Sequence, residues 1–175
     1  ERYLARLDML RSKAPDIELH SDFIVGYPGE TAAGFEATVD LVNRVGFAQS
    51  YVFKYSPRPG TLAAELPDDV PDAEKERRNH VLLAAQEALT WQHNRALVGK
   101  TTEVLVEGVS KVDGRLSGRT AHHRLVHFAS QDLDLVGQYV PVLVTEALAH
   151  SVVGDLLATT AAQEGAHDRS EVVHP

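Results

Sequence analysis

The sequence contains no cysteine among its 175 residues. Disulfide bonds are therefore excluded, and the chain has no thiolate that could bind zinc or an iron–sulfur cluster. No apolar run approaches the ~20 residues that a membrane-spanning helix needs, and no signal peptide follows Glu1. Because the first residue is not methionine, we expect a fragment of a longer protein. We also expect a cytoplasmic protein that has no membrane contact.

Positive charge is also scarce. The sequence has 17 Lys and Arg against 25 Asp and Glu, which gives a formal net charge of −8. This balance argues against a protein that coats nucleic acid through charge alone. One short segment has the opposite sign, because four basic residues and a single Asp lie between positions 111 and 124. The basic residues are Lys111, Arg115, Arg119 and Arg124. We expect them to bind RNA phosphates; the alternative is a solvent-exposed hairpin whose charges serve only solubility. Aromatic residues that could stack on bases are few here, namely Phe128 and Tyr139.

The N-terminal part alternates helix and strand. Apolar spacing predicts helices over residues 1–14 and 32–45, and strand composition predicts strands over 17–26 and 48–56. Thr31 is the expected N-cap of the second helix. This order predicts a βαβ unit with parallel strands.

The C-terminal part changes its pattern after a proline-rich connection. One long helix is predicted over 72–96, with Val81, Leu82, Ala85, Leu89 and Trp91 on its apolar side. Five short strands then follow closely, at 101–110, 114–120, 124–128, 137–148 and 151–157, and they predict a small β-barrel. The remaining residues, 158–175, have no period and are predicted to be disordered.

The segment DFIVGYPGET joins the first strand to the second helix. Ligands of α/β sheets sit at the carboxyl ends of the strands. Ile24 and Val25 could therefore offer an apolar wall to a ring, and Gly26 would allow close approach. The spacing is not that of a phosphate-binding glycine loop, and an ordinary βα-turn is the alternative.

The segment FKYSPRPGT ends the second strand in a stiff loop. Pro57 and Pro59 restrict the backbone on both sides of Arg58, so its guanidinium is presented at low entropic cost. Such an arginine suits a phosphate or carboxylate, although a solvated surface loop is the alternative. Lys54 interrupts an apolar strand. It is either a charged residue that prevents another strand from pairing with an exposed sheet edge, or a residue near a ligand.

No arrangement of Ser, His and Asp indicates nucleophilic catalysis, and the catalytic residues remain unknown. His122 and His123 are adjacent, so on a strand they would point to opposite faces. A metal site that both share is therefore not expected.

Taken in order, DFIVGYPGET, FKYSPRPGT, QHNRALVGK, EVLVEG, SGRT and GQYVPVLVTEAL resemble the C-terminal part of the radical-SAM methylthiotransferases, of the MiaB type. The resemblance covers about residues 1–157. It implies an α/β partial barrel of the radical-SAM type followed by a small all-β TRAM barrel. The implied divisions are the last βα-units of the radical-SAM domain at 1–66, a linker and connecting helix at 67–96, and the TRAM barrel at 97–157.

The family's activity would be the addition of a methylthio group to an N6-prenylated adenosine next to the anticodon of tRNA. It implies S-adenosylmethionine and [4Fe-4S] clusters, the latter held by a missing N-terminal part, so this chain alone should be inactive. By position, Ile24, Val25 and Gly26 would border S-adenosylmethionine, while Lys54 and Arg58 would face the substrate. The implied partner is the anticodon stem-loop, bound by a monomer.

The sequence also departs from the family pattern. His123 and His127 stand where Asn-like residues are expected, and Ala149, His150 and Val153 replace an expected Pro, Asn and Arg. Two further readings stay open: a non-catalytic RNA-binding module, and a sister enzyme that acts on threonylated adenosine or on a ribosomal protein.

Overall fold

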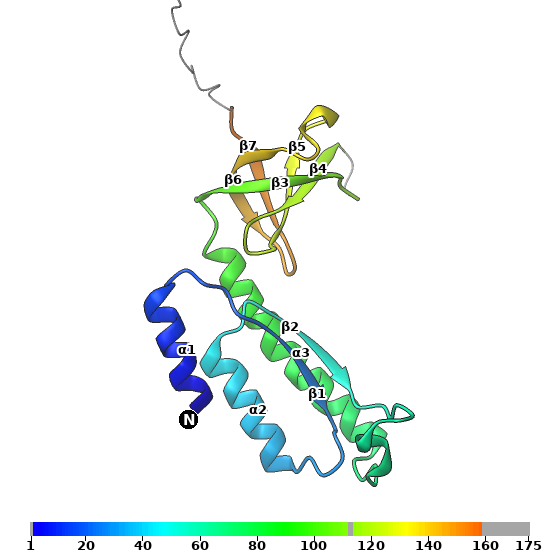
Figure 1. Cartoon of the computed structure of the whole chain (residues 1–175). Helices are drawn as coiled ribbons and strands as arrows, with labels where there is room; N and C mark the ends of the chain where they lie inside the picture. The colour runs from blue at the N-terminus through cyan, green and yellow to red at the C-terminus, as the bar shows by residue number, and fades with distance from the viewer. Residues whose placement is uncertain (1, 112–113, 159–175) are drawn as a thin grey trace, which may run out of the picture.

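A computed structural model describes residues 2–111 and 114–158, which form a βαβ unit, a long helix and a barrel (Figure 1). Strand β1 (His20–Val25) and strand β2 (Gln49–Lys54) pair in parallel, with helix α2 (Ala32–Val45) between them. Helix α1 (Arg2–Lys13) precedes β1. The predicted order of helices and strands and the parallel pairing are therefore confirmed.

Local chemistry sets the bounds of α2. The Thr31 hydroxyl caps the helix by accepting from the Gly34 N–H at 3.1 Å, and Gly46 ends it in the left-handed conformation at φ 64°. The apolar face of α2 joins a core on one side of the sheet. That core contains Leu7, Val25, Phe35, Val42, Val45, Phe47 and Leu82.

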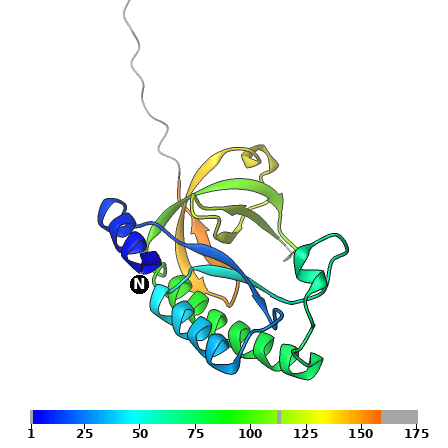
Figure 2. The same cartoon turned by 60° about the horizontal axis from the view of Figure 1, so that its bottom comes forward.

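The other face of this sheet is open. Ile24, Tyr51 and Phe53 remain 55%, 59% and 54% exposed, whereas parallel sheets are normally covered on both faces. Figure 2 shows α2 and α3 along the same side of the two strands. Within the described residues the sheet has only two strands, so any larger radical-SAM barrel lies beyond what this structure contains.

Helix α3 (Asp72–Arg95) has 24 residues and runs antiparallel to the strands. Its buried stripe is mostly polar, consisting of Lys75, Arg78, Leu82, Gln86, Thr90 and Asn94. The predicted apolar side is wrong in part, since Val81 and Trp91 are each 39% exposed. The reason is that α3 covers backbone carbonyls: Gln86 Nε2 donates to Phe47 O at 2.9 Å and Thr90 Oγ1 to Ala48 O at 3.2 Å.

The C-terminal unit is a closed five-stranded barrel, as the sequence predicted. Its strands are β3 (Thr101–Val109), β4 (Arg115–Arg119), β5 (Leu125–Ala129), β6 (Tyr139–Ala147) and β7 (Val152–Leu156), in the order β3-β4-β5-β7-β6. Alternate residues fill the interior, including Val104, Val106, Leu116, Val126 and Phe128. Short 3₁₀ turns, η1 (Leu62–Glu65) and η2 (Leu133–Leu135), were not predicted.

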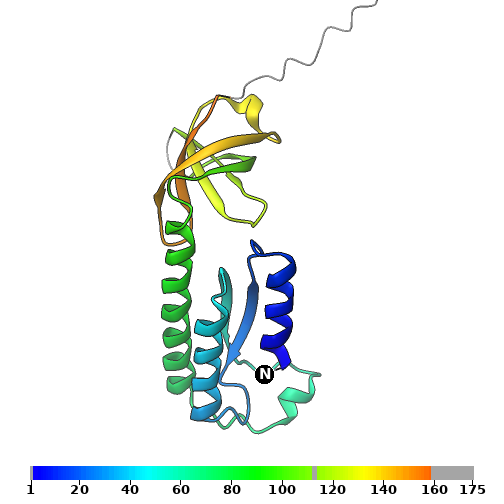
Figure 3. The ribbon, with the colours of Figure 1, turned by 90° about the vertical axis from the view of Figure 1, so that its left-hand side faces the viewer.

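Helix α3 continues directly into the barrel (Figure 3). At its end Asn94 is fully buried, and its Nδ2 donates to Leu148 O at 2.6 Å and to Ser151 O at 3.3 Å. The Gly99 N–H donates to Val144 O at 2.8 Å. The barrel is thereby held at the amino ends of β1 and β2. Apart from its first residue, the predicted disordered tail lies outside the described residues.

Candidate functional site

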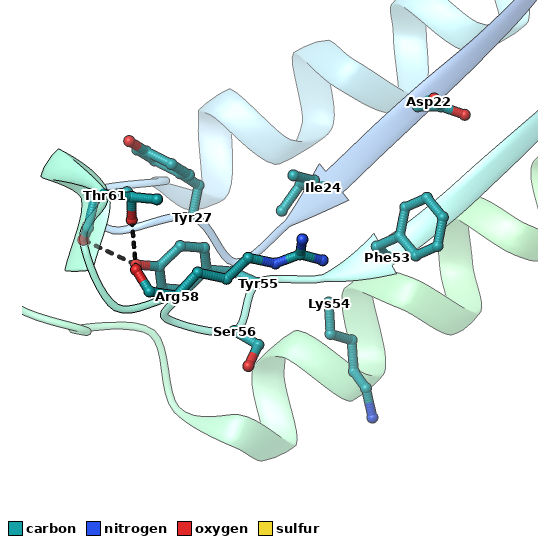
Figure 4. A pocket seen from close by; sticks show the side chains of 10 residues that line it. Asp22, Ile24, Tyr27, Phe53, Lys54, Tyr55, Ser56, Arg58 and Thr61 are labelled. Atoms are coloured by element: carbon teal, nitrogen blue, oxygen red, sulfur yellow. Dashed lines mark hydrogen bonds between the residues drawn. The ribbon is translucent and has the colours of Figure 1, made fainter.

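A pocket of about 530 Å³ lies at the carboxyl ends of β1 and β2 (Figure 4). We call it the carboxyl-edge pocket. Ile24 comes from the end of β1, Phe53 from β2, and Arg58 from the loop that follows β2. Its other lining residues are Asp22, Tyr27, Lys54, Tyr55, Ser56, Thr61 and Ala63. The volume falls in the range of ordinary small-molecule sites.

The loop after β2 is fixed by hydrogen bonds as well as by its prolines. The Thr61 hydroxyl donates to Arg58 O at 2.8 Å, and the Tyr55 hydroxyl donates to Ala63 O at 2.8 Å. Figure 4 shows the Arg58 side chain extending over the pocket, between Ile24 and Phe53. Among the described residues, its guanidinium has no hydrogen-bond or ion-pair partner. The loop therefore presents a fixed cation that has all its donors available.

Ile24, Val25 and Gly26, at the carboxyl end of β1, have different surroundings. Ile24 lines the pocket, and its predicted role as a wall for a ligand stays a prediction. Val25 instead has a fully buried side chain in the core against the helices, because alternate strand residues face opposite sides. Gly26 has φ 70°, and a Cβ there would meet the Lys75 Cγ at 2.3 Å, so a lysine side chain occupies the space close to it.

Buried charges on α3 hold the loops of this pocket from behind. Arg78 Nη1 donates to Glu30 Oε2 at 2.7 Å, and the same carboxylate oxygen accepts from the Gly26 N–H at 2.6 Å. Lys75 Nζ donates to Asp68 Oδ2 at 2.7 Å. Hydrogen bonds from Arg77 and Arg78 lower the pKa of Glu74 to about 2. Oppositely charged partners thus fix the turn after β1 and the connection that leads to α3.

Lys54 is among the lining residues, but its ammonium group points away from the pocket (Figure 4). The side chain lies on the opposite face from Phe53, as strand alternation requires, and pairs with Glu76 of α3. That Lys54 faces the substrate stays a prediction. The hydrogen bond and charge of Lys54 lower the pKa of Glu76 in turn.

Sequence reasoning missed the aromatic walls of the pocket. Tyr27 and Tyr55 pack edge to face with ring centroids 5.3 Å apart, and Tyr51 and Phe53 stack at 6.5 Å on the open sheet. The signal was present, because alternation places Tyr51, Phe53 and Tyr55 on one face of the strand. Apolar rings beside one free arginine suit a flat heterocycle that carries an anionic group.

The four predicted RNA-binding cations of the barrel differ in position and burial. Lys111 is exposed and Arg115 half-buried at one end of β4, while Arg119 and Arg124 lie at the other end, beside the turn to β5. Arg119 is exposed, with its Nε 3.3 Å from Glu107 Oε1. Arg124 differs most from the other three, because it is only 7% exposed and its Nη2 lies 2.7 Å from Glu18 Oε2. That it binds an RNA phosphate stays a prediction.

The aromatic and histidine expectations of the barrel are also revised. Phe128 is fully buried in the barrel core and is unable to stack on a base, whereas Tyr139 is 63% exposed. His122 and His123 lie in the turn between β4 and β5, not on a strand. Within residues 2–111 and 114–158, no group of three or more metal-ligating side chains could hold an ion.

Comparison with known proteins gives this geometry a context. Residues 95–157 match the TRAM domain model, which coincides with the barrel. A tRNA-2-methylthio-N(6)-dimethylallyladenosine synthase of Magnetococcus marinus is 48% identical over 158 residues, covering 90% of this chain. One of Chromohalobacter salexigens is 46% identical over 158 residues, or 89% of the chain.

This chain is a homologue of these synthases. It spans 36% and 35% of the length of the two relatives, so it corresponds to about a third of each. The resemblance to the MiaB-type methylthiotransferases is confirmed, as is the TRAM barrel. Among the helices in residues 2–111 and 114–158, none has the length and apolar character that crossing a membrane requires.

The family implies two kinds of cofactor, and the residues of this chain suit only one of them. The carboxyl-edge pocket fits a group the size of adenosine, with Ile24 and Phe53 as an apolar wall and Arg58 as a donor. A [4Fe-4S] cluster does not fit, because the chain has no cysteine and no alternative ligand cluster in its described part. Any cluster must therefore be held by other residues of a longer protein.

Proposed function

We propose that this chain is part of a radical-SAM tRNA methylthiotransferase, which adds a methylthio group to an N6-prenylated adenosine beside the anticodon. The main support for this proposal is the 48% identity to a tRNA-2-methylthio-N(6)-dimethylallyladenosine synthase over 90% of the chain. The open apolar face of the two-stranded parallel sheet supports the proposal, because it is the face that a larger barrel would enclose.

In this proposal the two units have separate tasks. The carboxyl-edge pocket borders S-adenosylmethionine through Ile24, and Arg58 meets the substrate at its rim. Val25 and Gly26 contribute backbone only, because the Val25 side chain is buried and Lys75 fills the space beside Gly26. The TRAM barrel binds the anticodon stem-loop, and Lys111, Arg115 and Arg119 are the cations on its exposed or half-exposed surface.

A nucleoside analysis tests the activity of the parent protein. Disrupting the gene that encodes this chain should remove the methylthio group from prenylated adenosine in tRNA, measured by mass spectrometry of digested tRNA. Loss of the methylthio group from threonylated adenosine or from a ribosomal protein would assign a sister activity instead. No change in any of the three would leave the RNA-binding module as the function.

Arg58 gives a sharper test of the pocket. In the intact enzyme Arg58→Ala should lower turnover while the melting temperature stays nearly unchanged, because the guanidinium has no partner within the described residues. Arg58→Lys should also be poor, since a lysine lacks the fixed fork of donors. Arg44→Ala on the exposed side of α2 is the matched control and should keep full turnover. Full turnover of both Arg58 variants would make the loop a solvated turn.

A further inference from the structure

A second pocket, of about 390 Å³, lies where the barrel meets the amino ends of β1 and β2. We call it the junction pocket. Its lining includes the side chains of His20, His123 and His150 together with Arg119 and Arg124. We propose that the junction pocket binds a phosphodiester group of RNA, an inference that rests on the proposed RNA-binding function.

The three histidines converge from segments that are distant in the sequence. His20 begins β1, His123 lies in the turn between β4 and β5, and His150 lies between β6 and β7. The fold thus gathers three imidazoles around one cavity, and their ring N–H groups suit an anionic oxygen.

The backbone supports a special role for His123. It has φ 61° and is the only non-glycine residue with positive φ among residues 2–111 and 114–158. Asparagine and histidine are enriched in this left-handed region, which explains why an Asn-like residue is expected there. The turn is fixed because Arg119 Nη1 donates to His123 O at 2.9 Å and the His123 N–H donates to Thr120 O at 2.9 Å. Backbone strain of this kind is concentrated at binding sites.

The electrostatics of the pocket favour an anion. Burial lowers the pKa of His20, Glu18 opposes this effect, and nearby Arg124, His123 and His122 lower the pKa further. An anion bound among the three of these groups that line the pocket, His20, His123 and Arg124, would offset their mutual repulsion. Only one nitrogen of the buried Arg124 guanidinium donates to a described residue, Glu18, and its Nε has no partner there. Arg119 is exposed; its Nη1 donates to His123 O and its Nε lies 3.3 Å from Glu107 Oε1, which leaves Nη2 for a ligand oxygen.

The position of the pocket selects RNA as the source of the phosphate. His20 and Ile24 share one face of β1, so the junction pocket and the carboxyl-edge pocket open on the same side of the sheet. His20 and Ile24 are four residue steps apart along β1, a distance of about 13 Å. Tyr51 lines the junction pocket and Phe53 lines the carboxyl-edge pocket, and their exposed, stacked rings suit base stacking. A strand that enters one pocket would therefore cross the other.

The test uses the full chain and an RNA stem-loop with an anticodon-loop sequence. The double variant His123→Asn and His150→Asn removes two imidazoles, and asparagine tolerates the left-handed backbone of the turn. Binding should weaken by about tenfold or more, as expected when hydrogen bonds to a charged group are lost. His122→Asn is the matched control, because His122 belongs to the same turn but does not line the pocket.

The outcomes separate this site from the proposed function. Weaker binding by the folded double variant, with near-normal binding by His122→Asn, supports the junction pocket; circular dichroism checks the fold. Equal binding by the unaltered chain and the double variant overturns the site alone. An equal loss in His122→Asn also overturns it, because the general charge of the turn would then be responsible. If the unaltered chain binds no RNA, the proposed RNA-binding role fails together with this site.

Discussion

Arg119 and Arg124 lie at the two ends of the turn between β4 and β5, and their surroundings differ sharply. The Arg119 side chain is 43% exposed and faces an equally accessible Glu107. Arg124 is buried against Glu18, which lies just before β1, so this pair connects the barrel to the βαβ unit. An ion pair at the surface contributes little to stability, whereas removal of one partner of a buried pair leaves an uncompensated charge.

We therefore predict opposite stability effects of the same change. Arg124→Ala should lower the free energy of unfolding by about 2 kcal/mol, because it leaves Glu18 partly buried without its partner. Arg119→Ala should change it by no more than about 0.5 kcal/mol. Urea denaturation of both variants measures the difference. Adding Glu18→Gln to Arg124→Ala should restore part of the loss, and equal stability of the two single variants would contradict the buried pair.

At the scale of the elements, the barrel depends on two glycines that allow strands to pass closely. A Cβ added to Gly118 of β4 would lie 2.1 Å from Leu105 O, and one added to Gly154 of β7 would lie 2.4 Å from Leu143 O. Both contacts are to backbone, which is unable to move aside as a flexible side chain can. The strands therefore require glycine at these positions to keep their register.

We predict that Gly118→Ala and Gly154→Ala each destabilise the barrel by about 1–3 kcal/mol or more, as overpacking does. Gly34→Ala in α2 is the control, since its Cβ would meet only the Thr31 Oγ1, at 3.4 Å. That change should stabilise the protein by about 0.4–1 kcal/mol through the unfolded state. Thermal unfolding monitored by circular dichroism compares the three. Tolerance of alanine at both barrel glycines would refute the close approach.

The elements were more predictable from the sequence than the sites. Strands and α2 follow local periodicity and capping, so Thr31 and Gly46 fix helix bounds without tertiary information. The buried face of α3 was not predictable, because Gln86 and Thr90 are inside only to satisfy carbonyls supplied by a distant loop. Likewise, Arg124 looks like its basic neighbours until the fold brings Glu18 to it. Long-range pairing of polar groups has no local signal.

At the scale of the whole molecule, α3 links the two pockets. Its first turns hold the loops of the carboxyl-edge pocket through Lys75 and Arg78, and its last turn holds the barrel through Asn94. A helix of 24 residues is about 36 Å long. One rigid element thus sets the spacing between the carboxyl-edge pocket and the TRAM barrel.

We predict that Asn94→Ala loosens the barrel from the βαβ unit. The change would leave Leu148 O without its Asn94 donor, at a cost of about 1–3 kcal/mol, whereas Ser151 O would still accept from the Leu148 N–H. A single thermal transition should split into two, measured by calorimetry, because the units would no longer unfold together. Asn43→Ala on the exposed side of α2 should keep one transition. One unchanged transition in Asn94→Ala would show that other contacts couple the units.

The strand order of the barrel also has a consequence for how the protein forms during synthesis. Strand β7, the last to be made, sits between β5, with which it pairs in parallel, and β6. Until it leaves the ribosome, β5 and β6 each have a bare edge and the barrel is unable to close. The βαβ unit has no such requirement, since β1, α2 and β2 emerge together. Translation would thus finish the nucleotide-sized pocket first and complete the barrel last, which leaves the nascent barrel open to edge-to-edge association.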